Sequence, residues 1–330
     1  MGINALVVCH AGAGLGLGHL TRSVVVASAL QQELDATVRF LIQGDPVHRD
    51  DLAQFEHHFL STDANLAETI YQQVQLIETQ IVVLDLHPEL VPTDIDLHLK
   101  ALRQVGCRVI GVDGLISHHS DLDLIFIPSF RLVLPVGFEG TTPILYGWDC
   151  FLLNVKRRAI DWKPGRQVLA LTGGGDATNL GRSLPTLLNA ALPGDTILNW
   201  VTGPYAQMPI WPEQPRFSMI NHQPPSGLDG LMTRVSYAVT VYGVSFFELL
   251  YYGVPTVVFS PYGNKDDPKL MAIATQGVAI VAKDEAEAVI KLKELMLDDG
   301  LALALSWRAR QILAAPGGHK FAQAVAALMA

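Results

Sequence analysis

Short runs of β-branched and aliphatic residues alternate with helical patterns along the chain, and this alternation is typical of a parallel α/β sheet. A first series of such runs covers residues 5–9, 38–42, 81–84, 109–112 and 124–127. A second series covers residues 168–171, 196–201, 219–220, 238–241, 256–259 and 278–281. Because the second half repeats the pattern of the first, we expect an α/β fold with two Rossmann-like, doubly wound domains facing a cleft.

The alternation pauses between residues 154 and 166, where basic residues, Pro164 and Gly165 interrupt the apolar pattern. We therefore place the first domain at residues 1–155 and the second at residues 167–330. A chain of 330 residues that is 49% apolar is large enough to fill two cores. An alanine-rich helix is expected over residues 320–329, after a Pro-Gly-Gly break, and the sequence leaves open on which domain it packs.

A glycine-rich loop follows the first apolar run and ends in a histidine. It reads GLGLGHLTRS over residues 14–23, and a helix is expected over residues 20–34. Gly16 and Gly18 would let the backbone approach a ligand closely. The helix N-terminus attracts anions and disfavours imidazolium, so His19 is a candidate base. The alternative is that the glycines form only a tight strand-to-helix turn.

Two common nucleotide motifs do not fit this loop. The spacing G-x-G-x-x-G fails in every register, because the last position falls on Leu17, His19 or Thr21. No G-x-x-x-x-G-K-[ST] motif is present, which argues against a P-loop NTPase.

A second glycine loop follows the first strand expected in the second domain. It reads LTGGGDATNLGRS over residues 171–183, where Gly174 and Gly175 free the backbone and Asp176 or Thr178 could cap a helix beginning near Asn179. The carboxyl end of a parallel strand is where such folds bind ligands. We therefore expect this loop to contact a substrate.

A third loop, YGVSFFELLYYGVP over residues 242–255, opens another expected helix. The backbone amides of this loop and Ser245, which follow Gly243, could bind a phosphate. Glu248 lies one turn further, and its carboxylate could accept hydrogen bonds from both hydroxyls of a ribose. A solvated helical glutamate is the alternative.

Composition excludes several classes of function. The net charge of −9, without any concentration of Lys and Arg, argues against a nucleic-acid partner. The three cysteines are widely spaced and form no C-x-x-C pair, and no metal site is expected. The sequence has neither a signal-peptide pattern nor an apolar run of about 18 residues, so we expect a cytoplasmic protein with no firm membrane signal. The oligomeric state stays open.

Four segments together resemble the GT-B nucleotide-sugar enzymes, in particular the UDP-sugar hydrolase of pseudaminic acid synthesis and the MurG-like glycosyltransferases. They are G-x-G-H-x-x-R at 16–22, GGGD-x-x-N at 173–179, G-x-S-x-x-E-L with G-V-P at 243–255, and YGWDCFLLN at 146–154. The resemblance spans nearly the whole chain, and it implies a GT-B fold and a UDP-sugar substrate. We expect chemistry without a metal or cofactor, because helix termini and backbone amides can neutralise the leaving diphosphate.

The resemblance also assigns roles to residues. The second domain would hold UDP, with Gly243 and Ser245 near the diphosphate and Glu248 on the ribose. His19 would activate water or an acceptor hydroxyl, and Arg22 of the same segment would bind the substrate. Asn264 matches the position that contacts the sugar.

Several positions depart from the family pattern. Tyr242 and Val244 flank a single glycine where a glycine pair is usual, and Lys265 follows Asn264 where glutamine is usual. In the first domain, the Asp-x-Tyr of the family reads Asp85, Leu86, His87. His87 could be a second acid or base, but we interpret it as a polar cap before Pro88. Three functions stay open: glycosyl transfer to an acceptor hydroxyl, which we expect; UDP-sugar hydrolysis; and non-catalytic binding of a nucleotide sugar.

Overall fold

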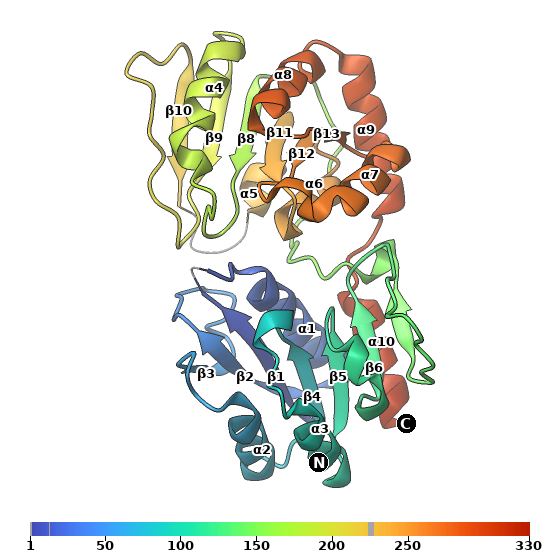
Figure 1. The fold of residues 1–330 in the computed structure, drawn as a ribbon. Helices are drawn as coiled ribbons and strands as arrows, with labels where there is room; N and C mark the ends of the chain where they lie inside the picture. The colour runs from blue at the N-terminus through green and yellow to red at the C-terminus, as the bar shows by residue number, and fades with distance from the viewer. Residues whose placement is uncertain (1, 13, 224–227) are drawn as a thin grey trace. The chain divides into compact units, whose positions relative to one another are not determined.

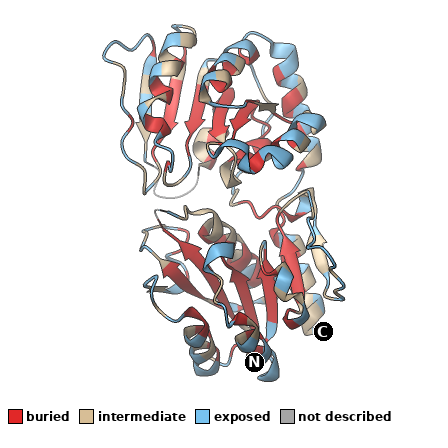
Figure 2. Ribbon diagram, in the orientation of Figure 1, coloured by how far each residue is buried: buried red, intermediate tan, exposed pale blue. Residues whose placement is uncertain are grey.

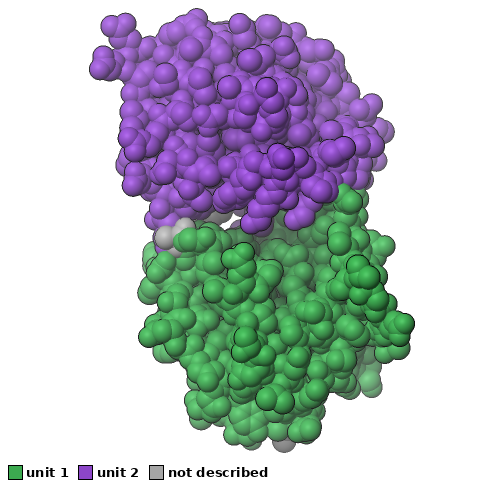
Figure 3. Space-filling model, viewed as in Figure 1, with its two compact units in different colours: residues 1–154, 316–330 green, residues 155–315 purple. Residues whose placement is uncertain are grey.

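The computed structural model describes residues 2–12, 14–223 and 228–330. The chain divides into two compact units (Figure 3). Unit 1 contains residues 1–154 and 316–330, and unit 2 contains residues 155–315. The basic segment expected between the domains, residues 155–166, thus belongs to unit 2, and the C-terminal residues belong to unit 1. Residue 13, directly before the first glycine loop, lies outside the described residues.

Unit 1 is built on a seven-stranded sheet with the order β3-β2-β1-β4-β5-β6-β7 (Figure 1). All neighbouring strands are parallel. The strands are β1 (Asn4–Ala11), β2 (Thr37–Gly44), β3 (Glu56–Leu60), β4 (Ile81–Asp85), β5 (Arg108–Val112), β6 (Leu124–Ile127) and β7 (Ile144–Tyr146). The helices are α1 (Gly18–Leu34), α2 (Leu66–Leu76), α3 (Ile95–Gln104) and α10 (Gly318–Met329).

Alternate side chains of β1 enter two different cores, because successive residues of a strand point to opposite faces. Val7 and Cys9 pack in one cluster with residues of α1 and α10. Leu6 and Val8 pack in another with residues of α2 and α3. Both faces of this sheet are therefore covered, which explains the nearly continuous burial of its central strands β1, β4, β5 and β6 in Figure 2.

Helix α10 completes the core of unit 1. Phe321 and Val325 are fully buried in the cluster that also contains α1, and the Phe321 ring meets the edge of Phe126 at 5.2 Å between centroids. The amide of Gly317 donates to the carbonyl of Phe151 at 2.7 Å, which fixes the start of the helix. The last segment of the chain is thus an integral layer of unit 1.

Unit 2 repeats the design with a six-stranded parallel sheet of order β10-β9-β8-β11-β12-β13. Helices α4 and α8 contribute to the core cluster on one face, and α5 and α6 to the cluster on the other. The strands are β8 (Gln167–Leu171), β9 (Ile197–Val201), β10 (Ser218–His222), β11 (Tyr237–Val241), β12 (Thr256–Phe259) and β13 (Ile280–Val281). The helices are α4 (Leu184–Ala191), α5 (Asp229–Met232), α6 (Val244–Tyr252), α7 (Asp267–Gln276), α8 (Glu285–Leu295) and α9 (Asp299–Ile312).

The doubly wound α/β prediction is confirmed for both halves of the chain. Each strand predicted from an apolar run is present, but two strands of unit 1 were missed. Strand β3 has the sequence EHHFL and is an exposed or half-buried edge strand, and β7 has only three residues. Neither contains the apolar run that identifies a buried parallel strand.

Candidate functional site

The order of the strands in unit 1 places two loops side by side at one edge of the sheet. β1 and β4 are neighbours, and the chain leaves β1 toward β2 on one side and β4 toward β5 on the other. The pairing register sets Cys9 opposite Asp85, the last residue of β4. Such a switch in strand order is where open α/β sheets bind ligands, outside the carboxyl ends of the strands. The glycine loop after β1 and the end of β4 both lie at this point.

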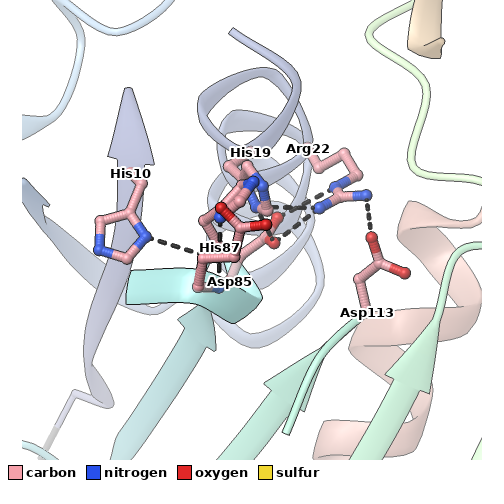
Figure 4. A network of polar contacts seen from close by, with 7 residues as sticks. His10, His19, Arg22, Asp85, His87 and Asp113 are labelled. Atoms are coloured by element: carbon pink, nitrogen blue, oxygen red, sulfur yellow. Dashed lines mark hydrogen bonds and ion pairs between the residues drawn. The ribbon is translucent and has the colours of Figure 1, made fainter. Parts of the chain in front are cut away.

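His19 and Asp85 form a hydrogen-bonded pair at this position (Figure 4). His19 lies in the first turn of α1, and its Nδ1 is 2.7 Å from Oδ1 of Asp85, whose side chain is only 1% exposed. An ionised carboxylate can only accept, so Nδ1 of His19 donates the proton. The neutral ring then carries its lone pair on Nε2. This arrangement is that of a general base oriented by a carboxylate.

Arg22 lies one turn further along α1 and holds the same carboxylate. Its Nε and Nη2 donate to Asp85 Oδ2 and Oδ1 at 3.1 and 2.7 Å, and its Nη1 donates to Asp113 Oδ2 at 2.6 Å. Nη2 also lies 3.1 Å from Nδ1 of His19. We assign Nδ1 as a donor because its contact with Asp85 is shorter and the carboxylate offers no proton.

The charges in this cluster determine the protonation of its members. Burial by itself raises the pKa of the Asp85 carboxyl, but the charge of Arg22 and the hydrogen bonds from His19 and Arg22 outweigh it and hold that pKa below its usual range. Burial lowers the pKa of Arg22, but Asp85 and Asp113 together raise that pKa by more, so the net shift is upward. Asp85 is therefore ionised, and Arg22 is bound by two carboxylates rather than presented alone to a substrate.

Two further histidines lie at the same carboxyl end of the unit 1 sheet. His87 follows β4, and its ring centroid is 5.8 Å from that of His19. Its Nδ1 accepts from the amide of Glu89 at 3.3 Å, at the start of the 3₁₀-helix η1 (Pro88–Leu90), in agreement with the polar cap that we expected. His10, in β1, is completely buried, and its Nδ1 accepts from the amide of His87 at 2.9 Å. Burial lowers the pKa of His10 to about 4.

The buried neutral His10 is expected to make stability depend on pH. Between about pH 4 and the ordinary histidine value of 6.5, the unfolded chain binds a proton that the folded chain does not. The free energy of unfolding should therefore rise with pH across this window, by up to about 3 kcal/mol more in the wild type than in His10→Asn. Urea unfolding of both proteins at a series of pH values measures the difference. Equal slopes would contradict the assignment.

The predicted loops of unit 2 follow three adjacent strands. The loop of Gly174 and Gly175 follows β8, that of Gly243 and Ser245 follows β11, and Asn264 lies beyond β12. Because the three strands are parallel neighbours, their loops emerge at one edge of the sheet. The fold thus brings the predicted unit 2 residues to one edge.

The side chains on these loops differ in their hydrogen bonds and in their exposure. The two oxygens of Asp176 accept from the amides of Leu180 and Gly181 at 2.9 and 2.8 Å, so this buried carboxylate caps the 3₁₀-helix η4 (Leu180–Arg182). Asn179 is exposed, with a left-handed backbone (φ 57°). Asp176, rather than Thr178, is therefore the residue that caps this 3₁₀-helix.

The remaining predicted residues lie on α6 and beyond β12. Gly243 immediately precedes α6, Ser245 is half-buried in its first turn, and Glu248 is buried in the next turn. Asn264 is exposed in the 3₁₀-helix η5 (Gly263–Asp266).

In the glycine loop of unit 1, Gly16 has a left-handed backbone (φ 73°) and its amide donates to the carbonyl of Gly12 at 2.8 Å, whereas Gly18 begins α1.

Gly203 packs closely against the backbone of the Gly174 loop, where a side chain would not fit. A Cβ added to Gly203 would lie 2.4 Å from the carbonyl oxygen of Gly174, whereas a Cβ on Gly243 would meet nothing within 4 Å. We expect Gly203→Ala to lower the free energy of unfolding by about 1–3 kcal/mol, because the backbone must shift. The matched control, Gly243→Ala, has extended backbone and should keep its stability. Chemical unfolding of both variants tests this, and equal losses would contradict it.

Sequence reasoning missed the contacts of Asp85 with His19, of Asp113 with Arg22, and of His10 with the amide of His87. Asp85 ends β4, and Asp113 directly follows β5. Polar residues at the carboxyl ends of adjacent buried strands were the available signal. Within the described ranges, no group of three His, Cys, Asp or Glu side chains is arranged to hold a metal ion. None of the helices described is long and apolar enough to cross a membrane.

Comparison with solved structures identifies the fold. UGT2 of Phytolacca americana, complexed with UDP-2-fluoro-glucose and pterostilbene, has a TM-score of 0.66 and 13% identity, and the match covers 99% of each chain. MurG of Acinetobacter baumannii has a TM-score of 0.62 and 16% identity, with 98% of this chain and 99% of that chain covered. The glycosyltransferase SnogD of Streptomyces nogalater has a TM-score of 0.62 and 15% identity, with 99% and 100% covered.

These likenesses extend over nearly the full length of all the chains compared. No protein-family model and no curated protein sequence matches the chain. The chain has the GT-B fold, and its predicted resemblance to GT-B proteins, MurG among them, is confirmed at the level of the fold.

Proposed function

We propose that the protein is a glycosyl transfer enzyme that uses a UDP-sugar and transfers the sugar to an acceptor hydroxyl. The observation that carries this proposal is the His19–Asp85 pair at the strand switch of unit 1. The GT-B fold is compatible with it, and the solved neighbours include proteins described as glycosyltransferases. A base oriented by a buried carboxylate is what transfer to a hydroxyl requires.

The reaction follows from the tautomer of His19. The acceptor hydroxyl gives its proton to Nε2 of His19, while its oxygen attacks the anomeric carbon of the donor. The bond from that carbon to the diphosphate oxygen breaks, and the diphosphate leaves with the bonding electron pair. Asp85 stabilises the imidazolium that forms, and it keeps the accepting nitrogen turned toward the substrate. Positioned base catalysis of this type contributes about 10²–10⁴ in rate.

The donor side of the proposal rests on unit 2. Helix α6 presents its first amides and Ser245 beyond Gly243, and such a helix N-terminus favours the charge of a diphosphate without a metal ion or cofactor. We assign Gly174 and Gly175 to the same ligand, Glu248 to the ribose, and Asn264 to the sugar. Isothermal titration calorimetry with UDP tests this assignment, because Glu248→Ala should weaken binding and unchanged affinity would remove Glu248 from the site.

A panel of nucleotide sugars, incubated with and without candidate acceptors, tests the reaction. UDP release that depends on an acceptor hydroxyl supports transfer. UDP release in water alone identifies a hydrolase, in which water takes the place of the acceptor at His19. Binding without turnover of any member of the panel would overturn the catalytic proposal in favour of a nucleotide-sugar-binding protein.

A further inference from the structure

The orientation of one buried amide, that of Gln43, is fixed by backbone carbonyls. Gln43 lies in β2, next to β1, and its Nε2 donates to the carbonyl oxygens of Ser61, Thr62 and Ala64 at 3.2, 3.4 and 3.0 Å. Carbonyl oxygens only accept, so the NH₂ group must face them. The Oε1 atom of Gln43 must therefore face the other way, where it lies 3.3 Å from Nε2 of His10.

This orientation determines the tautomer of His10. An amide oxygen accepts, so Nε2 of His10 carries the proton and donates it to Gln43. In a neutral ring, Nδ1 is then bare and can accept, and it receives the amide of His87 at 2.9 Å. The hydrogen bonds thus run in one direction, from the His87 amide through the His10 ring and Gln43 to the loop after β3. A doubly protonated His10 would set two donors against each other at Nδ1.

We propose that neutral His10 is a positioning residue for the His19–Asp85 pair, which acts by holding the backbone amide two residues after Asp85. The inference rests on the proposed function of His19. The amide belongs to His87, whose ring borders that of His19, so this single bond ties β1 to the exit of β4 (Figure 4). Loss of the bond would release the backbone that follows Asp85 at the end of β4 and would loosen the alignment of Asp85 with His19.

The surroundings of His10 favour the neutral ring. Its side chain is fully buried, and the charged or titratable groups around it are His19 on α1 and Asp85 and His87 on β4 and its exit, with the uncharged Gln43 on β2. Desolvation dominates, and the two histidines also disfavour a charge on His10, whereas the hydrogen bond to Gln43 and the charge of Asp85 favour it without reversing the downward shift of its pKa. The ring is therefore suited to accept a hydrogen bond permanently rather than to exchange protons with a substrate.

Two substitutions separate the two ends of the His10 ring. His10→Asn places an acceptor oxygen where Nδ1 was and gives up the Gln43 bond. His10→Gln reaches Gln43 with the amide group at its end, but it has no acceptor at the position of Nδ1, where the His87 amide donates. Exposed His58 of β3 provides the control, as His58→Asn. The measurements are amide hydrogen exchange at His87 by NMR, and kcat and KM for a nucleotide sugar identified by the panel.

In His10→Gln, we expect exchange at the His87 amide to become about tenfold faster and kcat to fall about a hundredfold with KM unchanged. His10→Asn should keep both properties near those of the wild type. Slow exchange in His10→Gln, or equal losses in the two variants, would overturn the proposal. Exchange needs no turnover, so an inactive wild type would refute the proposed function and still leave the His10–His87 bond testable.

Discussion

Replacing Asp85 with asparagine is expected to lower kcat by about 10²–10⁴ while UDP affinity stays unchanged. Arg22 donates to both oxygens of Asp85 and requires an acceptor. The side-chain oxygen of the new asparagine would turn toward Arg22, and its NH₂ group would face Nδ1 of His19. Nδ1 would then have to accept, which moves the ring proton to Nε2. His19 would no longer be able to take a proton from the acceptor.

Steady-state kinetics and calorimetry on the same preparation measure the effect of Asp85→Asn. The control is Asp195→Asn, since Asp195 pairs with Arg166 on the surface of unit 2. We expect this control to retain its turnover. A full kcat in Asp85→Asn, with the fold intact, would mean that the carboxylate does not set the tautomer of His19.

Replacing Arg22 with leucine should lower the free energy of unfolding by about 3–5 kcal/mol, because it leaves the buried Asp85 without its cationic partner. The Arg22 side chain is 13% exposed and that of Asp85 is 1% exposed, so water cannot replace the lost ion pair. At neutral pH, the carboxylate must stay charged in an apolar setting or take up a proton. The loss should become smaller as the pH falls toward the range where Asp85 is protonated.

Urea unfolding of Arg22→Leu, beside the matched variant Arg166→Leu, measures this loss. Arg166 forms an ion pair with Asp195 at 2.8 Å, but the two side chains are 46% and 62% exposed. Such a surface pair contributes about 0–1 kcal/mol, so this control should be close to the wild type. Similar losses in the two variants would show that burial does not distinguish the two arginines.

The sequence predicts most of the fold because a parallel strand buried on both faces requires an apolar run. The strands β1, β4 and β5 each contain such a run. Strand β3 does not, since its histidines lie on an exposed edge and its pairing with β2 is set by tertiary structure. Amino-acid composition and hydrophobic periodicity therefore do not identify an exposed edge strand of this kind.

The site is predictable only in part, for a related reason. His19 can be singled out because its glycine loop and helix start are local features of the sequence. The contact of His19 with Asp85 joins residues 66 positions apart and depends on the pairing of β1 with β4, which no local pattern encodes. The same holds for Arg22, which was predicted to bind substrate, but whose guanidinium the structure places on Asp85 and Asp113.

The central claim is that His19 is the base of a nucleotide-sugar reaction. It is tested most directly by the initial rate of UDP release from a sugar nucleotide that the wild type turns over, compared between the wild type and His19→Gln at neutral pH. The account predicts a rate about 10²–10⁴ lower in His19→Gln, with the same calorimetric affinity for UDP. An undiminished rate at equal affinity would contradict it.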